Sequence, residues 1–180
     1  MALIVEDGTG KADAESYISV ANADTYHANR GNTTWATLTT DEKEQALRRA
    51  TDYLLEVYRL RWKGTRINGE QSLDWPRGFV ERDDFEYQGL NGSTFIGGHF
   101  FYPSDEVPQE VENACALMAW KAAAGELAPD LSQGVLREKV DVLEVAYDPN
   151  SPQYVRYRAI DNLLRPFLQG GANSLKVKRV

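Results

Sequence analysis

Residues 39–61 read TTDEKEQALRRATDYLLEVYRLR, the longest helical pattern in the chain. Thr39 and Glu42 have the capping-box spacing, in which each side chain satisfies a free amide at the start of a helix. Apolar side chains then recur every three or four residues and form one stripe. The stripe consists of Ala46, Leu47, Ala50, Tyr53, Leu54, Val57 and Tyr58. This pattern predicts a long helix, over about 40–61, with one buried face.

Three further helices are expected around this one, over residues 20–30, about 108–124, and from Ser151 to about Pro166. Each has residues that favour a helix start or a helix end. These residues are Ser19, Gly31, Pro108, Gly125, Ser151, Pro152 and Pro166. The sequence therefore predicts a mainly α fold, a small bundle of about four helices, with residues 1–180 as a single domain.

Strand patterns and extended ends accompany the helices. Residues 135–147, VLREKVDVLEVAY, predict a strand whose apolar face changes after Val142, which indicates a bulge or a strand covered on both sides. Such a strand needs a partner from this chain or from another subunit. Residues 1–18 read as an extended arm that packs on its own subunit or on a neighbour. Residues 169–180 read as an extended tail.

Residues 79–106 form an aromatic insertion, interpreted as a β-hairpin or a long loop, with Asn91-Gly92 as a turn signal. So many aromatic residues in one loop favour contact with another surface, although they could instead fold back on their own core. The tail alternates apolar and basic residues, which suits a strand added to a partner's sheet, or a frayed terminus. The candidate interface residues are Phe100, Phe101, Tyr102, Leu175, Lys176, Val177, Lys178, Arg179 and Val180.

The overall charge and the scarcity of reactive side chains limit the possible functions. The formal net charge is -7, which argues against tight non-specific binding of nucleic acid. Cys115, the single cysteine, lies in a helical apolar pattern and is expected to be a buried structural thiol. No leader or membrane span is recognised, so synthesis in a cytoplasm-like compartment is expected.

No catalytic, cofactor-binding or metal-binding residues are predicted. The sequence has neither a Gly-rich phosphate loop nor Cys/His zinc spacing, and His27 is expected on a helix surface or at an interface. Acidic residues near the aromatic insertion are expected to form a solvated surface rather than a cation site. They are Glu81, Asp83, Asp84, Glu86, Asp105 and Glu106.

One stretch has the composition of a nucleic-acid contact. Arg59, Arg61, Lys63 and Arg66 surround Trp62, and cations around a stacking ring suit single-stranded nucleic acid. The alternative is the solvated end of the long helix with a buried indole, because cations are also favoured near a helix C-terminus. We keep both interpretations at this point.

The order of motifs resembles a family of small phage and prophage proteins. The matching stretches are 5–10 (VEDGTG), 14–20 (AESYISV), 21–27 (ANADTYH), 30–32 (RGN), 42–43 (EK), 46–54 (ALRRATDYL), 61–64 (RWKG), 75–77 (WPR), Pro108, Val111, Ala114 and the strand near 140–147. The similarity covers most of residues 3–147. Members are labelled DnaT-like single-stranded-DNA-binding proteins, and they are also similar to the head–tail connector (adaptor) proteins of tailed phages.

The connector resemblance implies a structural, non-enzymatic subunit of the virion neck. Its copies, about 12, would form a ring between the portal protein and a tail-completion, stopper or tail-terminator protein. Duplex DNA would pass through the lumen during genome packaging and ejection, and an acidic lumen would let it slide. The other label implies a replication protein that binds single-stranded DNA through Arg59, Arg61, Trp62, Lys63 and Arg66. Of the two, the sequence-based interpretation favours the connector and keeps DNA binding as the alternative.

Overall fold

The computed structural model describes residues 2–82, 100–129, 137–140, 143–146 and 155–170. In this part of the chain most of the regular structure is helical, and the predicted mainly α fold is confirmed. The helices are α1 (Val20–Ala28), α2 (Thr33–Ala36), α3 (Thr40–Tyr58), α4 (Gln109–Ala124) and α5 (Arg158–Leu164), followed by a 3-10 turn at Arg165–Phe167.

The helix boundaries agree with the local signals for α1, α3 and α4. The Thr39 hydroxyl accepts a hydrogen bond from the Glu42 amide, and the Glu42 carboxylate accepts one from the Thr39 amide, so the capping box is formed. Helix α3 ends at Tyr58, three residues before the predicted Arg61. Gly125 follows α4 as expected.

The last helix begins later than the sequence indicated. Residues 155–157 are not helical, and Ser151 lies outside the described residues. Tyr157 packs its ring 5.6 Å from Tyr53, and its hydroxyl donates to the Leu127 carbonyl at 3.2 Å. These contacts hold the residue at φ -94°, ψ 75°, outside the helical region, so α5 starts at Arg158.

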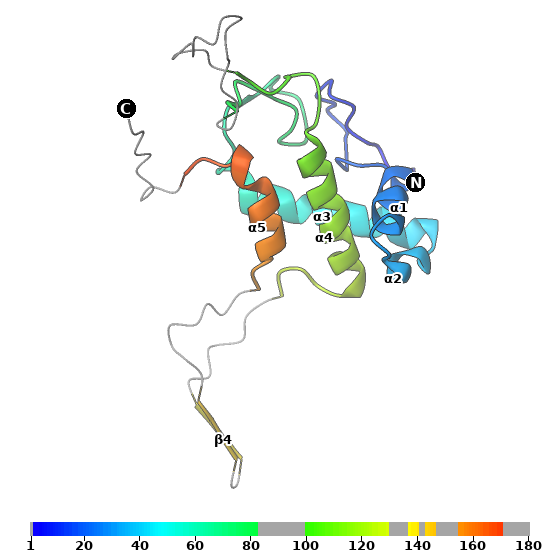
Figure 1. Cartoon of the computed structure of the whole chain (residues 1–180), viewed down its shortest axis with the longest axis vertical. Helices are drawn as coiled ribbons and strands as arrows, with labels where there is room; N and C mark the ends of the chain where they lie inside the picture. Colours follow the sequence, from blue (N-terminus) through cyan, green and yellow to red (C-terminus); the bar gives the residue numbers. More distant parts are fainter. Residues whose placement is uncertain (1, 83–99, 130–136, 141–142, 147–154, 171–180) are drawn as a thin grey trace, which may run out of the picture.

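Helix α4 is the centre of the body. Figure 1 shows α4 and α5 side by side, crossing α3, with α1 and α2 packed toward the other end of α3. Alanines allow α3 and α4 to approach closely: Ala46, Ala50, Ala114 and Ala119 are fully buried. Cys115 is also fully buried, as predicted, and burial raises the pKa of its thiol. Its Sγ lies 3.5 Å from Thr51 Oγ1.

The predicted single strand over 135–147 is instead two short strands. β3 (Arg137–Val140) pairs antiparallel with β4 (Leu143–Ala146), with Val140 opposite Leu143. The change of apolar face that indicated a bulge therefore marks a reversal of chain direction. The strand finds its partner within the same chain, because residues on either side of the reversal form the ladder.

The described part of the N-terminal arm, residues 2–18, packs on its own subunit. Ala14, Tyr17 and Ile18 join the core. The buried Glu6 carboxylate accepts hydrogen bonds from the amides of Gly8 (3.0 Å), Gly10 (2.8 Å) and Lys11 (2.9 Å). These bonds fix the glycine-rich turn against the body.

Two fully buried indoles organise the chain after α3. The Trp62 and Trp75 rings meet edge to face with centroids 5.7 Å apart, and Phe167 packs 5.5 Å from Trp75. β1 (Thr65–Arg66), which follows Trp62, pairs antiparallel with β2 (Arg77–Gly78), which follows Trp75. Among the described helices, none has the length and apolar character that a bilayer crossing requires.

Candidate functional site

The stretch that follows α3 is extended and pairs with the C-terminal end of the described chain. Trp62 and Leu168 form an antiparallel bridge. The Lys63 amide donates to the Phe167 carbonyl at 2.9 Å, and the Gln169 amide donates to the Arg61 carbonyl at 2.7 Å. Residues 61–63 and 167–169 therefore lie side by side, although about a hundred positions separate them in the sequence.

This pairing corrects the predicted role of Trp62. Successive side chains of an extended segment point to opposite sides, so Trp62 faces inward while Arg61 and Lys63 face outward. The Trp62 side chain is 1% exposed and packs against Tyr58 and Trp75. Its ring cannot stack on a nucleobase, and the alternative of a buried indole at the end of the long helix holds.

The cations of the predicted stretch lie at the surface. Arg61 is half exposed; its guanidinium lies 5.1 Å from the Tyr58 ring centre and 3.9 Å from Asp161. The Lys63 ammonium donates to the Pro166 carbonyl at 2.7 Å. Arg59 pairs at 3.2 Å with Asp74, whose side chain is buried, and Arg66 donates to the Gln71 carbonyl at 2.9 Å.

Helix α5 brings further cations to the same place. Arg156 lies 3.9 Å from Asp161, the carboxylate that Arg61 also approaches. Arg165 is exposed, one turn after Asp161 on the same helix face, and precedes the Pro166 that Lys63 contacts. We call Arg61, Lys63, Arg156 and Arg165 the basic surface. Sequence reasoning missed the two arginines of this surface that come from the α5 region, because nothing local places that region beside Arg61.

Asp161 is the carboxylate at the centre of this surface. It also accepts a hydrogen bond from the Tyr58 hydroxyl at 2.8 Å. Burial and this hydrogen bond raise the pKa of Tyr58, so the phenol stays neutral and remains a donor. Asp161 thus faces two cations, Arg61 and Arg156, in a chain that is acidic overall.

The ends of the aromatic insertion are paired. The Tyr102 amide donates to the Val80 carbonyl at 2.9 Å, and the Arg82 amide donates to the Phe100 carbonyl at 2.7 Å. This is the base of an antiparallel ribbon, as a hairpin predicts; the Asn91-Gly92 turn lies outside the described residues.

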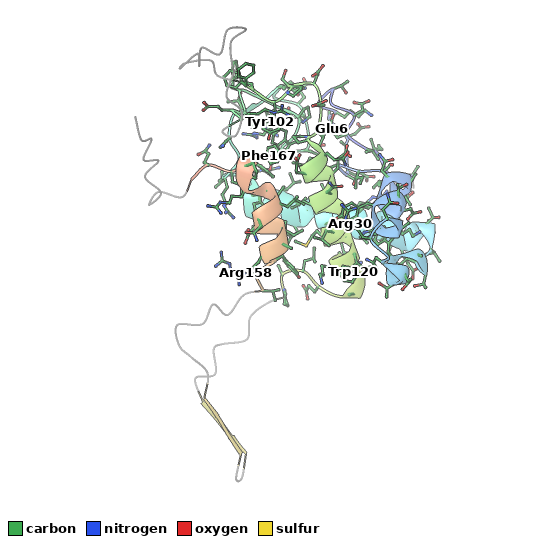
Figure 2. The ribbon with its side chains drawn as sticks, viewed as in Figure 1. Glu6, Arg30, Tyr102, Trp120, Arg158 and Phe167 are labelled. Atoms are coloured by element: carbon green, nitrogen blue, oxygen red, sulfur yellow. The ribbon has the colours of Figure 1, made fainter. Side chains whose placement is uncertain are left out.

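The predicted interface residues divide into three groups. Phe101 is exposed, whereas Phe100 is half-buried and Tyr102 packs inward, 4.8 Å from Phe167 (Figure 2). Arg82 stacks its guanidinium over the Tyr102 ring at 4.3 Å. The tail residues Leu175, Lys176, Val177, Lys178, Arg179 and Val180 lie outside the described residues.

Other hollows and clusters do not resemble a reactive centre. An open hollow of 580 Å³ between α3 and the end of α4 is lined by Asp52, Glu56 and Glu126 together with Arg49, so its charged lining is mainly acidic. Burial raises the pKa of Asp52. Within the described ranges no three His, Cys, Asp or Glu side chains are grouped for a metal ion. Asp105 and Glu106 are exposed, while residues 83–86 lie outside those ranges.

A family model places this geometry in context. The model described as "Putative DnaT-like ssDNA binding protein" matches residues 1–180. The chain belongs to this DnaT-like family. Neither the curated proteins nor the solved structures contain a match to the chain.

The family match corrects the preferred interpretation of the sequence. We expected a head–tail connector of the virion neck, and the match over the whole chain is to the DnaT-like family instead. The connector interpretation, with its portal and tail partners, is therefore replaced by the one that sequence analysis kept as the alternative. Self-association and the lack of an enzymatic activity stay predictions.

Proposed function

We propose that this protein binds single-stranded DNA through the basic surface formed by Arg61, Lys63, Arg156 and Arg165. The observation that carries the proposal is the pairing of residues 61–63 with 167–169, which brings Arg61 and Lys63 beside the segment that carries Arg165. Arg61 and Arg156 each lie 3.9 Å from Asp161. The family description, which names this ligand, supports it.

The charge distribution suits a binder that is salt-sensitive and moderate in strength. A cation that neutralises a phosphate releases a counterion, and each such contact lowers the slope of log affinity against log salt by about 0.7 for a single strand. The four cations of the surface would therefore give a slope of about −3. The net charge of -7 opposes any contact outside this surface.

The test is fluorescence anisotropy of a labelled oligothymidylate titrated with the protein between about 20 and 200 mM NaCl. The Arg61→Ala, Lys63→Ala double variant is expected to bind at least about tenfold more weakly and to lose about 1.4 from the salt slope, two contacts at about 0.7 each. Circular dichroism melting verifies that the variant is folded.

The matched control removes two cations from the other side of the body. Arg30 stacks on Tyr26 at 3.6 Å and Lys121 on Trp120 at 4.1 Å. Figure 2 shows Arg30 and Trp120 toward α1 and α2. Arg158, two residues after Arg156 of the basic surface, lies at the N-terminal end of α5. The Arg30→Ala, Lys121→Ala variant is expected to bind like the wild type. Equal losses in both double variants, or no binding of the wild type at 20 mM NaCl, would refute the proposal.

A further inference from the structure

Two exposed phenylalanine rings lie next to each other at the base of the aromatic insertion. Phe79 is 76% exposed and Phe101 is 46% exposed, and their ring centres are 6.2 Å apart at 86°. Their exposure contrasts with the full burial of Trp62, Trp75 and Phe167 among the described residues. We call Phe79 and Phe101 the phenylalanine pair.

The backbone holds the pair outward. In the paired segments 79–82 and 100–102, Val80 and Tyr102 face the core, so the alternating residues Phe79 and Phe101 face away from it. Phe79 also has φ 59°, a left-handed conformation that is costly for an aromatic residue. Buried Val80 on one side and the β2 pairing on the other fix this conformation.

Gly64 joins the pair to the basic surface. It has φ 67°, and a Cβ at this position would collide with the Gly78 carbonyl oxygen and lie 3.1 Å from the Phe79 carbonyl carbon. Gly64 directly follows Lys63, so the backbone of Phe79 runs next to the backbone stretch that carries Lys63. On the inner side, Tyr102 packs on Phe167, whose carbonyl accepts the Lys63 amide. The segment that carries the phenylalanine pair therefore lies directly beside the segment that carries Arg61 and Lys63.

We propose that the phenylalanine pair is the platform on which bases of the bound single strand stack, while the phosphates run over Arg61 and Lys63. This inference rests on the proposed function. Rings stack on the faces of unpaired bases, which a duplex keeps covered, so the platform selects single strands.

The first experiment compares the Phe79→Ala, Phe101→Ala variant with wild type on the same oligothymidylate. Affinity is expected to fall at least about tenfold, because the variant loses the stacking of bases on both aromatic rings. The salt slope is expected to stay unchanged, because the phosphate contacts remain. The Phe79→Trp, Phe101→Trp variant, which keeps aromatic faces, is expected to retain binding.

An oligonucleotide with abasic positions provides an independent readout. Wild type is expected to bind it at least about tenfold more weakly than oligothymidylate, whereas the double alanine variant binds both about equally, since the same contact cannot be lost twice. Both variants change exposed rings, and melting curves verify that they fold.

The possible failures are distinguishable. If wild type binds in a salt-dependent way and the double alanine variant binds equally well, the stacking platform is refuted while the basic surface stands. If wild type does not bind at 20 mM NaCl, the proposed function and the stacking platform are both refuted. If sedimentation shows that wild type self-associates and the double alanine variant does not, while DNA affinity is unchanged, the pair covers a second copy of the chain.

Discussion

His27 shows how a single residue differs between expectation and structure. It was expected on a helix surface or at an interface, and it is 2% exposed. Its Nε2 lies 3.0 Å from the Ala116 carbonyl oxygen, and its Nδ1 lies 3.2 Å from the side-chain nitrogen Nδ2 of Asn32. A carbonyl only accepts, so Nε2 carries the hydrogen and Nδ1 accepts. The neutral ring thus ties α1 to α4, and burial lowers its pKa.

This burial predicts a pH dependence of stability. The pKa of His27 is lower in the folded state than the ordinary 6.5, so below about pH 6.5 the unfolded chain takes up a proton that the folded chain does not. Stability is therefore full above about pH 6.5 and is lost as the pH falls, by at most about 1.4 kcal/mol per pH unit. Urea unfolding at several pH values between 7.5 and 5.5 measures this decrease in the free energy of unfolding.

The test is best made in a His99→Gln background, because His99 is the only other histidine in the sequence. In that background, adding His27→Gln is expected to flatten the pH profile above pH 5.5, where ordinary carboxylates do not titrate. An equally steep profile after this substitution would show that burial of His27 does not cause the effect.

At the scale of elements, helix starts were easier to predict than strand pairing. The cap of α3 depends on Thr39 and Glu42, three residues apart, and the sequence displays it directly. The hairpin β3–β4 was mistaken for one strand, because alternation in sequence does not tell a reversal from a bulge. The beginning of α5 was missed, because Tyr157 is fixed by contacts with the distant Tyr53 and Leu127.

The capping box makes a measurable contribution to α3. Thr39→Ala removes the hydroxyl that accepts the Glu42 amide, at 3.3 Å, and is expected to lower the free energy of unfolding by about 1 kcal/mol. The matched control is Thr40→Ala, also exposed and one residue into the helix, where alanine is a better helix former. Chemical denaturation of both variants measures the change in the free energy of unfolding. An equal decrease in the two variants would argue against a specific cap.

At the scale of the whole molecule, the core closes through residues far apart in the sequence. Phe167 is fully buried between Trp75 and Tyr102, at centroid distances of 5.5 and 4.8 Å. The same 3-10 turn presents the carbonyls that Lys63 contacts. Folding the C-terminal segment onto the indoles therefore completes the core and assembles the basic surface in one step.

Phe167→Ala is expected to destabilise the whole molecule by about 3–5 kcal/mol, the usual cost of emptying an aromatic position in a core. Phe101→Ala removes a ring of the same size from the surface and is expected to cost less than about 1 kcal/mol. Thermal and urea unfolding compare the two. Similar losses would contradict the distinction between a core ring and a surface ring that the structure makes.

The sequence alone determined the features that depend on neighbours within a turn or two. These are the mainly α fold, helices α1, α3 and α4, the cap at Thr39 and the buried Cys115. Their signals are local, because helix amides and apolar stripes are satisfied by residues three or four positions apart. The sequence also indicated a cationic stretch after α3, and it offered Trp62 as the stacking ring.

Only the tertiary structure decided which residues of that stretch face outward. Pairing with residues 167–169 turns Trp62 inward, and the fold of the α5 region adds Arg156 and Arg165 to the cations. Phe79, on the segment that runs beside Gly64, stays exposed. These arrangements join segments up to about a hundred residues apart. No local periodicity encodes such contacts, because they form only when the apolar surfaces of distant segments leave water together.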